Sequence, residues 1–87
     1  MSEESALTFP CEFPIKVMGI NSASFENEIF MIASQHLPNL GEAAISSAPS
    51  RRAKYLSVTV TITAQNREQL DTLYRAFSKH PDVKMVL

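Results

Sequence analysis

The stretch YLSVTVTITA, residues 55–64, carries the most regular two-residue alternation in the sequence. Its apolar residues share one face of a strand and its hydroxyl-bearing residues share the other, because successive side chains point to opposite sides of a sheet. Burying one such apolar side chain stabilises the folded state by about 1.5–3 kcal/mol. The free energy of unfolding of a whole domain is only about 5–15 kcal/mol. The pattern predicts a strand of fixed register. The buried set is Leu56, Val58, Val60, Ile62 and Ala64.

Another strand is predicted earlier in the chain, at residues 11–18 (CEFPIKVM), where apolar and polar side chains also alternate. The next segment, GINSAS at residues 19–24, is predicted to be a turn. Ser22 or Ser24 can cap the helix that follows, because a serine hydroxyl accepts a hydrogen bond from the free N–H groups of a first helical turn.

The first helix is predicted by apolar residues that recur at helical spacing up to His36, and Pro38 with Gly41 is expected to end it. A short strand is then expected at residues 42–47. The segment APSRRA, residues 48–53, is expected to be a loop that leads into the strand at residues 55–64.

A second helix is predicted to begin at Asn66, whose side chain can accept the Gln69 N–H while the Gln69 side chain reaches back. The sequence His-Pro-Asp at residues 80–82 ends this helix, and residues 83–87 are expected to form a last short strand. The apolar stripe of the helix consists of Leu70, Leu73, Tyr74 and Phe77.

This order of elements predicts an α+β fold, a ferredoxin-like βαββαβ sandwich in which both helices cover one face of a four-stranded antiparallel sheet. The two strongest strands, at residues 11–18 and 55–64, are expected to take the centre. Residues 1–8 are polar and acidic and are expected to be a disordered tip. Residues 9–87 are expected to form a single domain.

The composition argues against several kinds of partner. Eight basic and nine acidic residues give a net charge of −1, so no overall field attracts nucleic acid or an anionic membrane. No apolar run approaches the ~20 residues that cross a bilayer. Cys11 is the only cysteine, so an inert thiol without an internal disulfide is expected. With no signal-peptide pattern at the start, the expected location is the cytoplasm.

Enzymatic motifs are absent from the sequence. It contains no glycine-rich phosphate loop, no Cys-x-x-Cys and no His-Glu metal motif, so we expect no catalytic residues, no cofactor and no metal. His36 and His80 are expected at the C-terminal ends of the helices, where an imidazole ring interacts favourably with the last carbonyl groups. Met85 and Leu87 are expected to complete the core or the sheet edge.

Four segments carry a resemblance to the YbeD-like family of small bacterial proteins, whose function is unknown. They are FPIKVMG (residues 13–19), SVTVTIT (residues 57–63), TLY (residues 72–74) and the ending VKMVL (residues 83–87). The resemblance implies a ferredoxin-like fold similar to the ACT-type regulatory domains of amino-acid metabolism. It also implies an association with lipoate metabolism through gene neighbourhood, without a mechanism.

The turn after the first strand is the candidate small-ligand site, formed by Gly19, Ile20, Asn21 and Ser22. Free N–H groups at a helix N-terminus attract carboxylates and phosphates, and the resemblance implies a ligand at this turn because ACT-type domains place amino acids there. The alternative is that Gly19 only supplies the backbone freedom for a tight exit from the strand.

Three of the eight basic residues, Arg51, Arg52 and Lys54, lie in the predicted hairpin loop. Their side chains can hold a phosphate, an acidic protein surface or an RNA backbone. The alternative is a solvated loop whose charge only opposes aggregation.

The open face of the predicted sheet is the candidate partner surface. Sheets of this topology that read RNA present stacking aromatic residues, and here only Tyr55 is placed to do so, so no nucleic acid is expected. The alternatives that remain are a solvated threonine-rich face and a flat contact with another chain. The residues concerned are Lys16, Met18, Ser57, Thr59, Thr61 and Thr63.

These observations favour a non-enzymatic regulatory or adaptor module that acts through protein–protein contact. An alternative is an ACT-like sensor that pairs as a homodimer and binds a small anionic ligand, an amino acid or a lipoate-like acid. A third, weaker alternative is an acylphosphatase-type enzyme, but such enzymes use an arginine in the first turn and residues 19–24 contain none. No membrane partner is expected.

Overall fold

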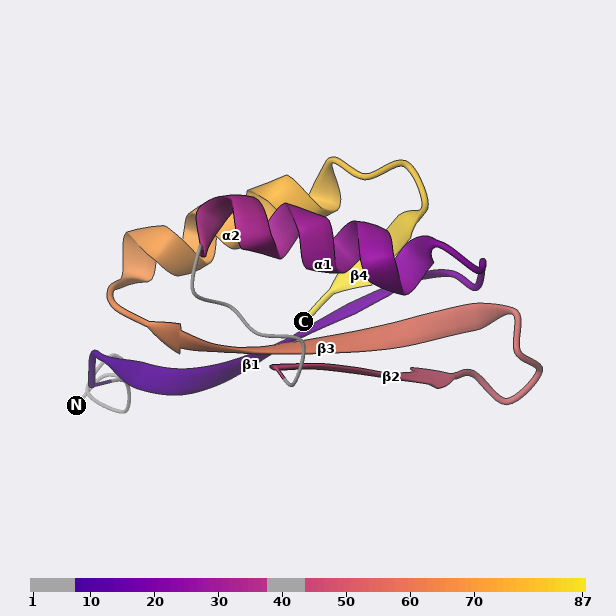
Figure 1. The fold of residues 1–87 in the computed structure, drawn as a ribbon, viewed down its shortest axis with the longest axis horizontal. Coiled ribbons are helices and arrows are strands. Elements are labelled where there is room, and N and C mark those ends of the chain that lie inside the picture. Colours follow the sequence, from indigo (N-terminus) through magenta and orange to yellow (C-terminus); the bar gives the residue numbers. More distant parts are fainter. Residues whose placement is uncertain (1–7, 38–43) are drawn as a thin grey trace.

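Helices and strands follow one another in the expected order, β-α-β-β-α-β, in this computed structural model, which describes residues 8–37 and 44–87. Figure 1 shows both helices lying above the sheet. Within the described residues, neither helix is long and apolar enough to cross a membrane. The elements are β1 (Cys11–Ile20), α1 (Phe25–His36), β2 (Ile45–Pro49), β3 (Tyr55–Ala64), α2 (Arg67–Ser78) and β4 (Val83–Val86).

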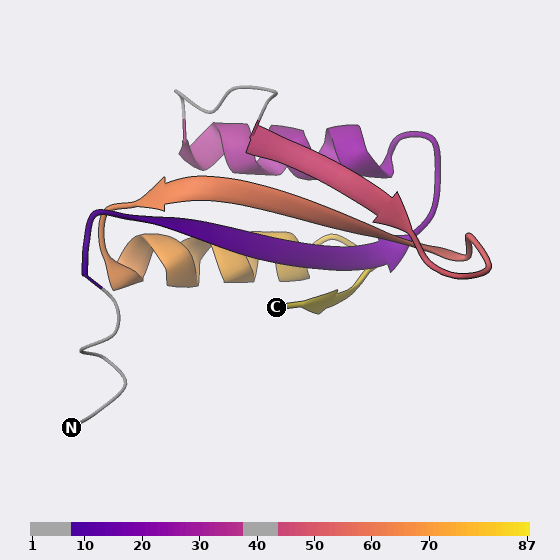
Figure 2. The same cartoon turned by 90° about the horizontal axis from the view of Figure 1, so that it is seen from below.

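One four-stranded sheet has the strand order β2-β3-β1-β4, with every neighbouring pair antiparallel. The longest ladder joins β1 to β3, from Cys11 opposite Ala64 to Ile20 opposite Tyr55. The two strands with the clearest alternation therefore lie at the centre, which confirms that expectation. Figure 2 looks onto the sheet from the side away from the helices.

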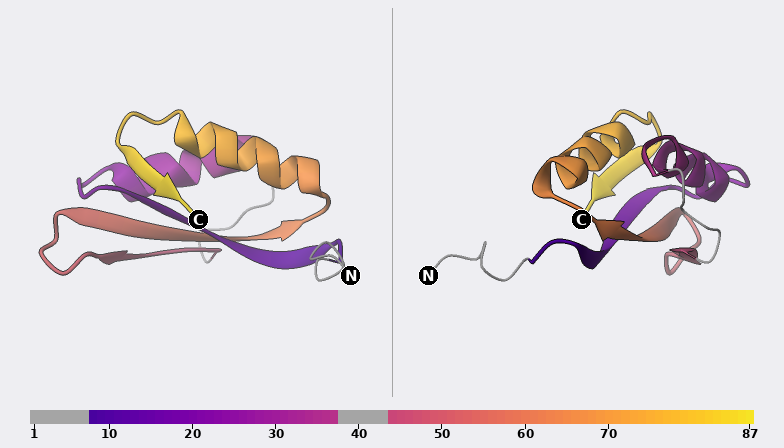
Figure 3. Two further views of the ribbon diagram at one scale, coloured as in Figure 1. Left: turned by 180° about the vertical axis from the view of Figure 1, so that it is seen from behind. Right: turned by 60° about the vertical axis from the view of Figure 1, so that its left-hand side comes forward.

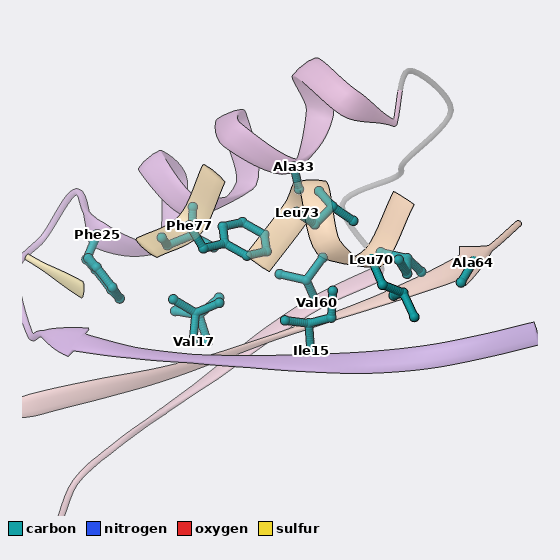
Figure 4. Packing of buried hydrophobic residues seen from close by; sticks show 12 residues of the cluster. Ile15, Val17, Phe25, Ala33, Val60, Ala64, Leu70, Leu73 and Phe77 are labelled. Carbon is teal, nitrogen blue, oxygen red and sulfur yellow. The ribbon is translucent and has the colours of Figure 1, made fainter. Parts of the chain in front are cut away.

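The core lies between the sheet and the two helices. The inward side chains of β3 are buried as the alternation predicts, except that Leu56 is only partly buried at the end of the strand. Figure 4 shows Ile15 and Val17 on β1 facing Leu73 and Phe77 on α2. The fully or almost fully buried apolar residues are Ile15, Val17, Phe25, Ile29, Ala33, Val58, Val60, Ile62, Ala64, Leu70, Leu73 and Phe77.

Helix α2 begins as predicted, with one change in the hydrogen bonding of its first turn. The Asn66 side chain accepts the Gln69 N–H at 2.8 Å. The Gln69 side-chain oxygen accepts the N–H of Gln65 at 2.8 Å, and not that of Asn66. The backbone of Asn66 is extended, so the chain enters the helix with the N–H of the preceding residue within reach.

The expected strand ends were wrong at two places. Strand β1 continues to Ile20, and β2 (Ile45–Pro49) continues past residue 47, while the expected start of that strand at residues 42–43 lies outside the described residues. Both ends follow from backbone pairing with β3, which a side-chain pattern does not report. Residues 48–49 therefore belong to β2 and not to the loop. The expected stop of the first helix at Pro38 and Gly41, and most of the expected tip at residues 1–8, lie outside the described residues.

Candidate functional site

Gly19 belongs to strand β1 and is buried. A Cβ atom at this position would lie 2.5 Å from the Asp82 carbonyl oxygen and 2.7 Å from Cε1 of Phe25, with Cζ of Phe25 closer still. The backbone at Gly19 does not itself require glycine, because no described glycine has a positive φ. Glycine is needed here because a ring and a backbone carbonyl approach it, not because the chain must turn. Of the expected ligand turn, Gly19 and Ile20 lie in the strand and only Asn21 and Ser22 lie beyond it.

Asn21 joins the end of β1 to the loop between β2 and β3. Its backbone N–H donates to the Lys54 carbonyl at 3.1 Å, and its side-chain Nδ2 donates to the Ala53 carbonyl at 2.8 Å. Ser22 is exposed, and its carbonyl accepts the Phe25 N–H at 3.3 Å. The structure thus brings together two groups of residues that the sequence offered as separate candidates, the ligand turn and the basic loop.

The β2–β3 loop is held by its own hydrogen bonds. The backbone N–H of Ser50 donates to the Tyr55 carbonyl at 2.8 Å, and the Ser50 hydroxyl accepts the Tyr55 N–H at 3.0 Å. The ammonium of Lys54 lies 5.6 Å from the centre of the Tyr55 ring, a cation–π contact. Arg51 and Arg52 are exposed at the tip. The loop lies at the end of the molecule where α1 begins, as Figure 1 shows.

The first turn of α1 carries its own negative charge. Ser24 occupies the N-cap position, but its hydroxyl donates to the Glu28 carboxylate at 2.9 Å and makes no capping bond to the backbone. Glu26 accepts the Ser47 hydroxyl at 3.1 Å. Carboxylates at a helix N-terminus already interact with the helix dipole. An anionic ligand at this end would therefore depend on the basic loop rather than on the helix alone.

His80 connects α1 to the segment before β4, a role that the sequence did not indicate. Its Nε2 lies 2.6 Å from Oε1 of Glu28, and its Nδ1 accepts the Asp82 N–H at 3.1 Å. The Phe25 ring meets the imidazole edge to face, with centroids 5.7 Å apart. The expected interaction of the His80 ring with the last carbonyl groups of α2 is wrong, because both ring nitrogens have other partners. His36 is exposed, and its expected interaction stays a prediction.

Glu28, His80 and Asp82 place possible metal-ligand atoms within 4.8 Å of one another. A metal ion needs a lone pair on an imidazole nitrogen. Because Nδ1 accepts the Asp82 N–H, the ring proton is assigned to Nε2, which donates it to Glu28. Both nitrogens are thus used, and the arrangement suits a hydrogen-bonded link between elements better than a metal centre.

This link predicts a pH dependence of stability. Hydrogen bonds from His80 and Ser24 lower the pKa of the Glu28 carboxyl from its ordinary value of 4.5. A carboxyl whose pKa is lowered in the folded state stabilises the fold at any pH above its ordinary pKa. That contribution is lost as the pH falls through the lowered pKa. Glu28→Gln should therefore have a lower Tm than the wild type at neutral pH, with the two curves converging in acid.

Thermal unfolding followed across that pH range measures the effect. Asn27→Gln, on the same helix, changes no titratable group and should run parallel to the wild type. A Glu28→Gln curve parallel to the wild type at every pH would contradict the assigned role of the carboxylate.

The uncovered side of the sheet brings together all six residues of the candidate partner surface. Lys16 lies opposite Thr59, and Met18 lies opposite Ser57. The two views in Figure 3 show that the helices lie on the other side. Lys16 and Thr63 are exposed and the remaining four are half-buried, so the central side chains support one another across the strands.

Of the two expected places for Met85 and Leu87, the sheet edge is confirmed and the core is wrong, because both lie on or just after the edge strand β4 and face the open side. They are 47% and 63% exposed. Met85 lies opposite Met18, and Leu87 exchanges backbone hydrogen bonds with Lys16 at 3.0 and 2.7 Å. Simple alternation would place Val83 and Met85 on the same face of the sheet. The pairing register of β4 with β1 shifts between Met18 and Gly19, however, so Lys84 is an extra residue without a partner on β1. The shift directs Val83 to the core and Met85 to the open face, and the sequence did not reveal it.

A shallow open hollow of about 350 Å³ lies between α1 and β2, and the sequence did not indicate it either. Its two polar lining side chains have partners of their own: Glu26 accepts the Ser47 hydroxyl, and the Asn27 amide donates to the Met31 sulfur at 3.8 Å. It is lined by Ala23, Glu26, Asn27, Phe30 and Ile45.

Two solved structures share this architecture. The solution structure of protein HP0495 from H. pylori matches with a TM-score of 0.75 at 15% identity, over 93% of this chain and 85% of that one. The crystal structure of the ACT domain from the GTP pyrophosphokinase of Chlorobium tepidum matches with a TM-score of 0.69 at 20% identity, over 87% and 94%. At such identities the likeness shows the fold alone, and it confirms the ferredoxin-like, ACT-like class.

Relatives of much higher identity are bacterial. A UPF0250 protein of Janthinobacterium sp. (strain Marseille) is 49% identical over 84 residues, 97% of this chain and 92% of that protein. The UPF0250 protein NE1487 of Nitrosomonas europaea is 41% identical over 87 residues, the whole of both chains. A family model described as a protein of unknown function, DUF493, matches residues 4–87. The chain therefore belongs to this DUF493 family, the UPF0250 or YbeD-like proteins that its strand motifs resemble.

Proposed function

We propose that the protein is a non-catalytic regulatory or adaptor module that binds another protein chain through the open face of its sheet. The observation that carries the proposal is the pairing of Met18 with the exposed Met85 on a face that neither helix covers. Exposed apolar side chains grouped on a surface are typical of contact sites. Methionine adapts to partners of irregular shape because its side chain is unbranched and polarisable.

The chemistry of the described residues supports a contact role over catalysis. The one histidine with a defined environment, His80, has both ring nitrogens in hydrogen bonds. A catalytic base needs a nitrogen within reach of a substrate proton. On the open face, Tyr55 is the single aromatic side chain among the described strand residues, which favours a protein partner over stacked nucleotides. Action in the cytoplasm is part of the proposal, and a single cysteine suits that compartment.

Affinity capture from an extract of the native cells tests this function. Thr59→Glu with Thr61→Lys places two large charged side chains on the face, and Glu at position 59 lies opposite Lys16, so the sheet is retained. The matched control is Asp71→Lys with Thr72→Glu on the exposed side of α2. We expect partners to be lost from the first variant and kept by the control. A folded face variant that retains every partner contradicts the proposal.

A second function, a dimeric sensor of a small anionic ligand, is supported by the bonds of Asn21 to Ala53 and Lys54. These bonds hold the basic loop beside the turn, and the fold is similar to that of an ACT domain. A ligand that binds only the native state raises the Tm. Amino acids and lipoate-like acids should therefore raise the Tm of the wild type but not that of Arg51→Ser with Arg52→Ser. A panel that leaves the wild-type Tm unchanged contradicts this function.

A further inference from the structure

The apolar part of the open face is concentrated at one end. Ile20 lies opposite Tyr55, Met18 lies two residues before Ile20, and Met85 lies opposite Met18. Leu87 is bonded to Lys16 in the same register. We call these five residues the Met85 patch: Met18, Ile20, Tyr55, Met85 and Leu87. Ile20 faces Tyr55 and Met18 faces Met85 as directly opposite pairs, and all five residues lie on the open face.

Basic side chains surround the Met85 patch. The ammonium of Lys54 lies over the Tyr55 ring, Lys16 precedes Met18 by two positions on β1, and exposed Lys84 lies in the bulge beside Met85. The one acidic residue of β1, Glu12, lies opposite Thr63 at the far end of the face. Although the chain as a whole is almost neutral, the charged side chains next to the Met85 patch on these strands are lysines.

The strand edge next to the patch is not suited to pairing with another strand. Strand β4 has only four residues, and Lys84 sits in a bulge. Short strands, bulges and lysine are features that protect a sheet edge from strand addition. A partner therefore contacts the side chains of the face and not the backbone of the edge.

A second copy of the chain could not pair the carboxylates of its first helix with these lysines without losing existing bonds. The carboxylates on its first helix, Glu26 and Glu28, are already bonded to Ser47 and His80. They would have to leave these partners to reach the lysines of another molecule, and breaking such bonds costs free energy.

From these observations we infer that the Met85 patch binds an acidic segment of another protein that also presents apolar side chains. The inference rests on the proposed contact function and names its partner. Apolar side chains of the segment cover Met18, Met85 and Leu87, and its carboxylates pair with the surrounding lysines. Charge complementarity of this kind sets specificity and association rate.

Fluorescence anisotropy with a soluble synthetic peptide of Glu, Leu and Phe tests the inference, with a matched peptide that has Lys in place of Glu. We expect saturable binding of the acidic peptide, weakened by salt, and no binding of the basic one. Lys16→Glu with Lys84→Glu, and separately Met85→Ser with Leu87→Ser, should each weaken binding by about tenfold or more. Arg67→Glu, at the start of α2 on the other layer, is the control and should bind as the wild type does.

The inference is overturned if the acidic peptide does not bind, if the two peptides bind equally, or if both patch variants bind as the wild type does. Tighter binding to vesicles of phosphatidylglycerol than to the peptide also overturns it and indicates a membrane surface instead. Circular dichroism confirms that each variant is folded. If partners are lost with Thr59→Glu and Thr61→Lys but kept by both patch variants, the inference fails while the proposed function stands.

Discussion

Replacing Phe25 with alanine is expected to lower the free energy of unfolding by about 3–5 kcal/mol. Phe25 is fully buried at the start of α1, where its ring lies against Gly19 and meets the edge of His80. Removing the ring leaves a cavity where β1, α1 and the segment before β4 meet. Because a small domain has about 5–15 kcal/mol of stability in total, the variant should be close to unfolding.

Denaturant titration measures this loss directly as a shift of the midpoint. Met31→Ala is the matched control, since it truncates a large apolar side chain of the same helix that is 55% exposed. The control should change stability by less than about 0.5 kcal/mol. Equal losses in the two variants would show that the ring of Phe25 is not buried as described.

Gly19→Ala is the second large effect, with an expected loss of about 1–3 kcal/mol from overpacking. The new methyl group meets the Asp82 carbonyl oxygen at 2.5 Å and Cε1 of Phe25 at 2.7 Å. The carbonyl belongs to the backbone and accepts the Ile20 N–H at 3.0 Å, so the segment before β4 must move and strain that hydrogen bond. The variant should therefore unfold at a lower denaturant concentration than the wild type, and the shifted segment should disturb the Met85 patch.

Combining Gly19→Ala with Phe25→Leu separates the two clashes. The shorter leucine side chain gives way to the methyl group, so the double variant should lose less stability than the sum of the single ones. Part of the loss should remain, because the Asp82 carbonyl is still in the way. A Gly19→Ala variant as stable as the wild type would contradict the close packing at this position.

The fold could be predicted from the sequence because its strongest signals are local. The alternation in residues 55–64 and the apolar stripe of α2 each identify the apolar face of a single element. The buried residues of β3 and α2 lie on these faces. Element ends were less predictable. Where β1 and β2 stop depends on pairing with β3, a property of two segments distant in the sequence.

The candidate sites depended still more on contacts between distant residues. The link of Asn21 to Ala53 spans 32 residues, and that of His80 to Glu28 spans 52. Neither has a local pattern that would reveal it. The reason for Gly19 was likewise hidden, because the atoms that exclude a side chain there belong to Phe25 and Asp82.

The Met85 patch shows how one irregularity changes a functional interpretation. Without the extra residue in β4, Val83 and Met85 would share a face, and Met85 and Leu87 would be predicted to lie in the core. The bulge turns Met85 and Leu87 outward beside Met18. The open face then has an apolar end and a hydroxyl-rich middle, where the sequence alone indicated an almost uniform row of threonines.

Site-specific photo-crosslinking in cells that express the protein naturally tests most directly whether the open face binds a protein partner. A photoreactive side chain at Thr61 lies on the open face, and one at Asp71 lies on the exposed side of α2. We predict a discrete covalent adduct with another protein from position 61 and none from position 71. Adducts from position 71 alone, or none from position 61 in a folded and stable protein, would contradict the account.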